Sequence, residues 1–169
     1  MEEQSRLSEK RTYVRKAAFG AGCFWHVQDI FSNTNGVVKV TSGYMGGKEE
    51  EFPQPTYEKV CTGKTGYIEV VLVEYDPYVL SYEDLLKIFW DMHEPTSLDK
   101  QSGDAGTQYK SVIFYYDYEQ KSSAEKSKSQ LQNTLNKEIV TEILPAKNFF
   151  KAEERHQDFL KKKKANCGV

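Results

Sequence analysis

The stretch Phe19-Gly20-Ala21-Gly22-Cys23-Phe24-Trp25 joins two predicted elements near the start of the chain. Residues 14 to 19 are predicted to form a short strand, and the apolar residues between Cys23 and Phe31 recur at helical spacing. Cys23 is therefore predicted in the first turn of a helix that leaves the end of a strand. Because unpaired backbone N–H groups at that position favour an anion, we expect a lowered pKa for the Cys23 thiol.

Two other interpretations of this stretch stay open. Gly20-x-Gly22 between a strand and a helix is typical of a dinucleotide-binding loop, but Trp25 occupies the place of the third glycine. Cys23 is also compatible with a small buried core residue, which is a common role for cysteine. The spacing alone does not decide between a reactive and a structural Cys23.

The composition favours one domain, residues 1–169, with a flexible leader over residues 1–12. The chain has 11 Tyr, 9 Phe and 2 Trp, and tyrosine suits a pocket that holds a polar group inside an apolar wall. A net charge of −2 gives no reason to expect a nucleic-acid partner. We also expect no membrane association and no signal peptide, because no apolar run has the required length.

The three cysteines, Cys23, Cys61 and Cys167, are an odd number at wide spacing. They suit neither a secreted disulfide framework nor a zinc site, so we expect a cytoplasmic protein without a metal. Cys61 is interpreted as a structural thiol. Cys167 lies in residues 165–169, which have no apolar anchor and are predicted to form a mobile tail.

The elements alternate along the chain, which predicts an α+β fold. Ser81 and Asp84 form a predicted capping box at the start of a helix, and long polar loops are expected at 43–55 and 94–106. Strands are predicted at 36–43, 68–75, 109–116 and 143–144, and further helices at 118–137 and 153–164. The resulting architecture is a two-layer α/β sandwich with a mixed sheet and long loops gathered at one edge.

Glu69 lies in the clearest predicted strand, residues 68–75. Alternation places it on the same face as Val71 and Val73. A buried carboxylate must be partnered or protonated, and burial raises its pKa, as a proton donor requires. Exposure at the strand end is the ordinary alternative, and the pattern leaves both open.

Five motifs in order resemble the A-type peptide methionine sulfoxide reductases, and this similarity covers residues 13 to 160. The resemblance implies a ferredoxin-like core and an irregular C-terminal tail. The chain departs from the family pattern at Tyr67-Ile68, at Lys110 and in the residues before Cys167, which puts the docking of the tail in doubt. The motifs are Gly22-Cys23-Phe24-Trp25, Gly43-Tyr44-x-Gly46-Gly47, Pro55-Thr56-Tyr57 with Val60-Cys61, Gly66-x-x-Glu69, and Gly106-Thr107-Gln108-Tyr109.

The resemblance implies reduction of the S epimer of methionine sulfoxide, in proteins and also as the free amino acid, and hence repair of oxidised proteins. A thiolate attacks the sulfur, an acid protonates the oxygen, and an apolar slot holds the methyl group. By this resemblance Cys23 is the nucleophile that becomes a sulfenic acid, and Glu69 is the proton donor. Tyr57 and Tyr109 bind the oxygen through their phenol groups. Phe24 and Trp25 form the apolar slot, and Asp104 orders substrate and water.

Turnover by this route requires a second thiol. The resemblance implies that Cys167 resolves the sulfenic acid as a disulfide, which thioredoxin then reduces. No other cofactor is expected, and the protein is expected to be a monomer.

Two other functions are compatible with the sequence. Cys23 paired with His93 or His156 would form an acyl-transfer dyad, which a thioester trapped on Cys23 would reveal. A non-catalytic module that grips methionine peptides in an aromatic cleft would bind methionine and its sulfoxide equally, and its Cys23 would have ordinary reactivity.

Overall fold

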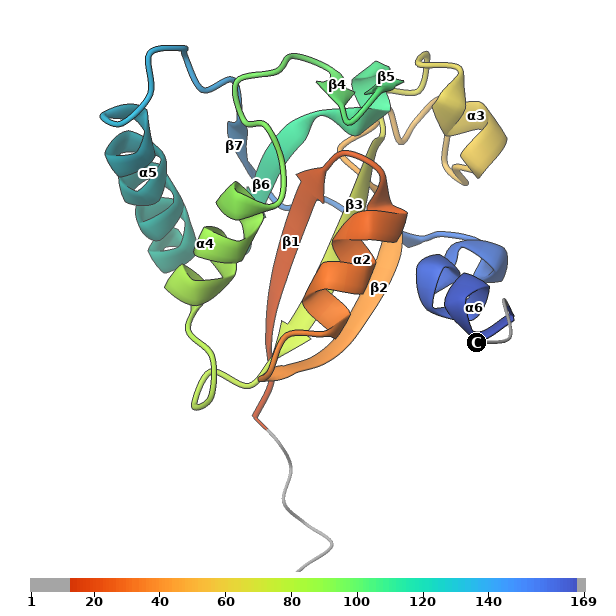
Figure 1. Ribbon diagram of the computed structural model, residues 1–169. Helices are drawn as coiled ribbons and strands as arrows, with labels where there is room; N and C mark the ends of the chain where they lie inside the picture. The colour runs from red at the N-terminus through yellow and green to blue at the C-terminus, as the bar shows by residue number, and fades with distance from the viewer. Residues whose placement is uncertain (1–12, 167–169) are drawn as a thin grey trace, which may run out of the picture.

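The computed structural model describes residues 13 to 166, in which helices pack on a six-stranded sheet (Figure 1). The sheet order is β7-β6-β1-β3-β2-β8, with β6 and β7 parallel and the other pairs antiparallel. The strands of this sheet are β1 (Arg15–Ala21), β2 (Val37–Met45), β3 (Ile68–Tyr75), β6 (Ser111–Tyr115), β7 (Glu142–Pro145) and β8 (Phe150–Lys151), while β4 (Lys100–Gln101) pairs with β5 (Asp104–Ala105).

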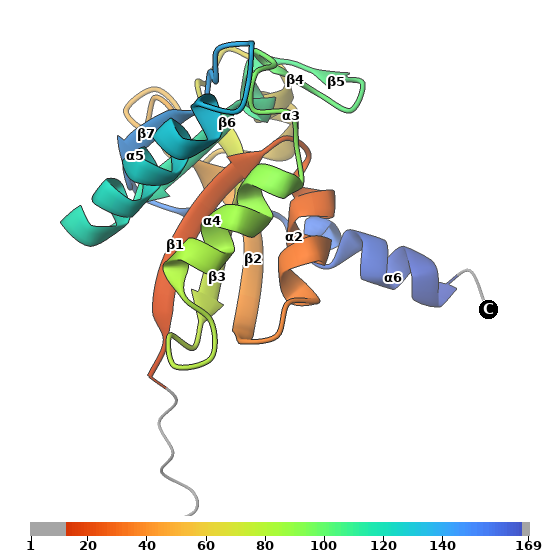
Figure 2. The same cartoon turned by 60° about the vertical axis from the view of Figure 1, so that its left-hand side comes forward.

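The helices are α2 (Phe24–Ser32), α3 (Tyr57–Cys61), α4 (Tyr82–Asp91), α5 (Tyr118–Gln132) and α6 (Phe159–Asn166), with 3₁₀ turns η1 (Thr107–Tyr109) and η2 (Glu154–His156). Apart from the short α3, β4, β5 and η1, the succession β1-α2-β2-β3-α4-β6 is ferredoxin-like, so the predicted α+β fold with a mixed sheet is confirmed. Figure 2 shows α2 and α4 lying over the sheet and α6 leaving beside α2.

Alternate residues of the strands divide the core between the two faces of the sheet. On the helical face, the ring of Phe19 stacks on Phe31 of α2 and Phe89 of α4, with ring centroids 5.3 Å apart in both pairs. On the opposite face a smaller cluster includes Met45 and Phe114. The strand alternation therefore fixes which side chains of β3 lie beneath the helices.

Two local predictions are confirmed in detail. Strand β3 has the predicted bounds, Ile68–Tyr75. The capping box forms as expected: the Asp84 backbone N–H donates to Ser81 Oγ at 3.0 Å, and the Ser81 N–H donates to Asp84 Oδ2 at 3.1 Å. Both features depend on residues close together in sequence, which explains why the pattern predicts them well.

The C-terminal helix differs from its prediction over residues 153–164. The chain forms η2, then turns at Asp158, whose φ is +52°, and only then enters α6. The break occurs because Gln157 is buried and its amide is committed to the backbone of Ser42 and Ala152. Residues 165 and 166, predicted as part of the tail, instead lie in α6, whereas the predicted leader and Cys167 lie outside the described residues.

Candidate active site

Cys23 lies where β1 turns into α2, as the sequence predicts. It is the N-cap residue of α2 and is half-buried. The preceding Gly22 has a φ of +93°, and a Cβ at this position would lie 2.7 Å from Cβ of Gln101. The turn that presents the thiol therefore requires glycine, both for its backbone conformation and for space.

Glu69 projects from β3 toward this turn and is only 1% exposed. Its Oε1 accepts a hydrogen bond from the Phe24 backbone N–H at 3.2 Å, while Oε2 has no partner among residues 13 to 166. Of the two interpretations left open, burial is right and strand-end exposure is wrong. Burial raises the pKa of Glu69 to about 8, against the lowering effect of the Phe24 N–H, so the acid is mostly protonated at neutral pH.

The pKa of the Cys23 thiol differs from the prediction. Burial raises this pKa to about 11, and it outweighs the backbone N–H groups of Trp25 and His26, which lower it. The charges of Glu69 and Asp104 act in the same direction as burial. The expected lowering at the helix terminus is therefore wrong for the free site, because desolvation of the thiolate exceeds the benefit of the N–H groups.

Two phenols share the electrostatic environment of the acid. Tyr57 is the first residue of α3, and burial, followed by the nearby Cys61, raises its pKa to about 12. Tyr109 ends η1, and burial and then the Glu69 charge raise its pKa. Both hydroxyls thus keep their protons and can donate hydrogen bonds, so the structure brings Tyr57, Tyr109, Cys23 and Glu69 into one neighbourhood.

Asp104 and Cys61 lie at the margin of this neighbourhood. Asp104 is on β5, and its charge raises the pKa of Glu69. The sequence favours a structural role for the Cys61 thiol, but this residue is exposed at the end of α3. The reason is that α3 buries only Val60, so the next residue faces outward.

Phe24 and Trp25, the predicted apolar wall, have different surroundings. Phe24 is fully buried against Tyr44 and His156, with ring centroids 5.8 and 5.6 Å away. Trp25 is half-buried, donates from Nε1 to His156 Nδ1 at 3.0 Å, and stacks on Phe159 at 3.9 Å. Phe24 is thus part of the core, whereas Trp25 retains a partly open face.

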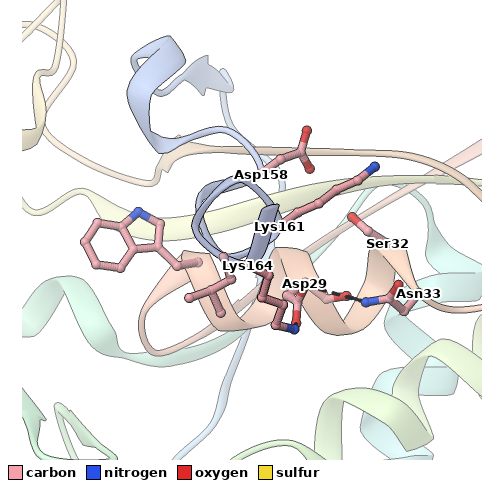
Figure 3. Close-up of a pocket in the computed structure, with 8 residues that line it drawn as sticks. Asp29, Ser32, Asn33, Asp158, Lys161 and Lys164 are labelled. Carbon is pink, nitrogen blue, oxygen red and sulfur yellow. Dashed lines mark hydrogen bonds and ion pairs between the residues drawn. The ribbon is translucent and has the colours of Figure 1, made fainter. Parts of the chain in front are cut away.

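A pocket of about 190 Å³ lies between α2 and α6 (Figure 3). Across it, Lys164 Nζ of α6 lies 3.3 Å from Asp29 Oδ2 of α2. Cys23 and Glu69 do not line this pocket, so it is separate from the thiol site. The lining residues are Trp25, Asp29, Ser32, Asn33, Asp158, Leu160, Lys161 and Lys164.

Neither candidate base of an acyl-transfer dyad serves Cys23. The two ring nitrogens of His93 lie 2.7 Å from the Phe89 carbonyl oxygen and 2.6 Å from Ser111 Oγ, and burial lowers the pKa of His93 to about 4. His156 Nδ1 accepts from Trp25. Among the described residues no hydrogen bond joins either ring to the thiol, so the dyad receives no support.

The sequence contains no signal that Glu153 belongs near the site. Its Oε2 accepts from the backbone N–H of Tyr57 at 3.1 Å, although 96 positions separate the two residues. No local pattern signals such a contact.

Two kinds of feature are absent from residues 13–166. No helix in this range combines the length and apolarity needed to cross a bilayer. Three or more His, Cys, Asp or Glu side chains do not gather there in an arrangement suited to a metal ion.

Comparison with known proteins places this site in a family. A family model described as peptide methionine sulfoxide reductase matches residues 15–168. A peptide methionine sulfoxide reductase MsrA of Methanothermobacter thermautotrophicus is 52% identical over 149 residues, covering 87% of this chain and 86% of the relative. The MsrA of Geobacter sulfurreducens is 48% identical over 156 residues, covering 91% and 94%.

A solved structure agrees with these relatives. The crystal structure of reduced Mxr1 from Saccharomyces cerevisiae superposes with a TM-score of 0.86 at 32% identity, covering 92% of this chain and 88% of that one. Family model, relatives and fold thus point to the same family as the motifs around Cys23 and Glu69. The chain therefore belongs to the peptide methionine sulfoxide reductase family.

Proposed function

We propose that this protein reduces the S epimer of methionine sulfoxide in oxidised proteins, and of the free amino acid, to methionine. The proposal rests mainly on the burial of Glu69. This side chain is 1% exposed, and its carboxyl group accepts a hydrogen bond from the turn that presents Cys23. Burial raises its pKa to about 8, so a neutral acid stands beside a thiol at neutral pH. This is the pair of groups that reduction of a polar S–O bond requires.

In the proposed reaction the Cys23 sulfur attacks the sulfoxide sulfur. Glu69 gives its proton to the sulfoxide oxygen, and the thiol proton restores the acid, so no net proton is taken up. The oxygen ends on Cys23 as a sulfenic acid, and the substrate leaves as a thioether; Cys23 is oxidised by two electrons and the substrate sulfur is reduced by two. Tyr57 and Tyr109, both protonated, bind the oxygen as its charge develops.

Substrate selection is assigned to the surroundings of Cys23. Trp25, which keeps a partly open face, supplies the apolar slot for the methyl group, the fully buried Phe24 contributes to that slot through the core, and Asp104 orders the substrate backbone and water. Because the sulfoxide sulfur is pyramidal, a slot for methyl on one side and donors for oxygen on the other accept one epimer.

Recycling is assigned to Cys167. Its thiol condenses with the Cys23 sulfenic acid, forming a disulfide and releasing water, and a dithiol protein of the thioredoxin type reduces that disulfide. We further propose a single catalytic domain over residues 1–169, active as a cytoplasmic monomer without a resident metal or organic cofactor and without nucleic-acid or membrane partners. The support is the cysteine spacing and the modest net charge of −2.

The test is a product assay on a peptide carrying either epimer of methionine sulfoxide, with dithiothreitol as reductant and Cys23→Ser beside the wild type. We expect methionine from the S epimer only, and none from the variant. Glu154→Gln is the control, because Glu154 is exposed and has no role in the proposed reaction, and it should retain activity.

Two results would contradict the proposal. No methionine from either epimer, with Cys23 shown to be reduced, would remove the reductase function. Equal rates for the two epimers would agree with the proposed reductase activity but would contradict the proposed selection of one epimer by the methyl slot.

A further inference from the structure

The side chain of Glu153 joins three parts of the molecule. It lies just before η2, is half-buried, and accepts a hydrogen bond from the Tyr44 hydroxyl at 2.9 Å through Oε1. Its other oxygen, Oε2, accepts from the Tyr57 backbone N–H at 3.1 Å. One carboxylate thereby connects the C-terminal segment to buried β2 and to the first residue of α3.

Helix α3 buries little of its own surface in the core. It contains five residues and buries only Val60 in the core. A helix this short is not stable by itself, so its position depends on tertiary contacts. The orientation of Tyr57, which this helix carries, therefore depends on the groups that pack against α3.

The residues after Glu153 strengthen the same attachment. Arg155 forms an ion pair with Glu58 on α3, and its guanidinium lies 5.8 Å from the centroid of the Tyr57 ring. The ring of His156 lies 4.4 Å from that ring, centroid to centroid. Residues 153 to 156 thus contact Tyr57 at its backbone and on its ring.

The charge of Glu153 suits this role. Burial opposes ionisation, but backbone N–H groups, including that of Tyr57, together with the Tyr44 hydroxyl, keep the pKa of Glu153 below its ordinary value. An ionised carboxylate accepts hydrogen bonds with both oxygens and binds more strongly than a neutral amide, which retains only one acceptor oxygen.

We propose that Glu153 is a positioning residue that sets where the Tyr57 hydroxyl lies in the active site. It does not touch the reacting atoms; it holds the start of α3 against the buried hydroxyl of Tyr44. The inference rests on the proposed function, since it assigns Glu153 an effect that is exerted through Tyr57.

The first experiment compares Glu153→Gln with the wild type in the S-epimer peptide assay. We expect kcat/KM to fall roughly 10- to 100-fold, the loss that accompanies misplacement of a catalytic group by about 1 Å. The matched control is Glu154→Gln, because Glu154 is exposed and its carboxylate forms an ion pair with Lys151 on the surface. The control should stay within about twofold of the wild type.

The second experiment separates positioning from general destabilisation through a double-mutant cycle with Tyr57→Phe. If Glu153 acts through the Tyr57 hydroxyl, Glu153→Gln should produce little further loss once that hydroxyl is absent. An equal fold-loss in the wild-type and Tyr57→Phe backgrounds would overturn the proposal. Wild-type protein inactive on the S epimer would instead overturn the proposed function on which the inference depends.

A third variant keeps the test decisive if Glu153→Gln folds poorly. Tyr44→Phe removes one donor to Glu153 but leaves the carboxylate and its bond to Tyr57. We expect a smaller loss of kcat/KM that also disappears in the Tyr57→Phe background. A loss that persists in that background would contradict the positioning role.

Discussion

Burial keeps both the Cys23 thiol and the Glu69 carboxyl group protonated in the free site. Burial is the main reason that their pKa values rise to about 11 and about 8, and the Glu69 charge adds to the rise at Cys23. A site that holds a thiol and a carboxylic acid is nearly uncharged at neutral pH. In the proposed reaction the substrate meets a proton donor already in place, and the thiol gives its proton to Glu69 once that acid has protonated the sulfoxide oxygen.

Glu69→Gln should stabilise the fold at alkaline pH. The pKa of Glu69 lies near 8 in the folded state, against an ordinary value of 4.5. The contribution of protonated Glu69 to the free energy of unfolding is therefore complete below pH 4.5 and is lost as the pH rises through 8. A neutral amide of the same shape avoids this loss, which amounts to at most roughly 3 to 5 kcal/mol.

Urea denaturation of both proteins at pH 5 and pH 8.5 checks this prediction. The advantage of the variant should grow with pH while its reductase activity is lost. Parallel pH profiles for the two proteins would mean that Glu69 does not change its protonation between the folded and unfolded states in this range.

Alkylation of Cys23 should be slow at neutral pH. Because the pKa of this thiol is near 11, its rate with iodoacetamide should rise about tenfold per pH unit between pH 7 and 10. Peptide-resolved mass spectrometry distinguishes it from Cys61, which is exposed and should react faster at pH 8. A rate for Cys23 that is already constant at pH 7 would contradict the effect of burial.

At the scale of elements, α6 begins beside α2 and leads away from it at a steep angle (Figure 2). Phe159, the first residue of α6, stacks on Trp25 near the start of α2, and Lys164 pairs with Asp29 further along both helices. Cys23 precedes α2 and Cys167 follows α6 in sequence. The length of α6, about 12 Å for eight residues, exceeds the Cα separation of a disulfide, about 4.4 to 6.8 Å.

Formation of the Cys23–Cys167 disulfide should therefore require α6 to leave α2 or to unwind. Phe159→Ala removes the aromatic stack and should speed disulfide formation after a single turnover. The measurement follows sulfenic acid, trapped with dimedone, and disulfide by mass spectrometry over time. Lys163→Ala, which changes an exposed position of the same helix, is the control, and equal rates for the two variants would contradict the release of α6.

At the scale of the whole molecule, a buried polar network anchors the C-terminal segment. The Gln157 amide bonds to Ser42 and Ala152, and Gln28 Nε2 of α2 donates to Gln157 Oε1 at 3.3 Å. The network ends where Asp158 turns the chain, so residues before it are held firmly and α6 after it depends on its contacts with α2. One segment thereby supplies a fixed support for α3 and the helix that precedes Cys167.

Cys167→Ser should separate the two halves of the proposed cycle. The variant should still reduce one equivalent of sulfoxide, because Cys23 and Glu69 are intact, but it should not be recycled by thioredoxin. Rapid-quench measurement of the first turnover, beside a steady-state assay coupled to thioredoxin reductase, checks both parts. Unchanged recycling would remove Cys167 from the mechanism.

The amino-acid sequence by itself determined the features that depend on neighbours along the chain. The valine-rich alternation of β3 predicted its bounds and the face that Glu69 occupies, and Ser81 with Asp84 predicted the start of α4. The ordered motifs predicted the family and the residues proposed for the site. Each of these signals lies within a few positions of the residue it concerns.

Only the tertiary structure decided the quantities that depend on what packs against a residue. The helix terminus alone suggested a low pKa for Cys23, but burial beneath distant segments raises it. The contact of Glu153 with Tyr57 spans 96 positions, and the break before α6 follows from the burial of Gln157. Desolvation and long-range hydrogen bonds arise when segments meet in the fold, so no local pattern encodes them.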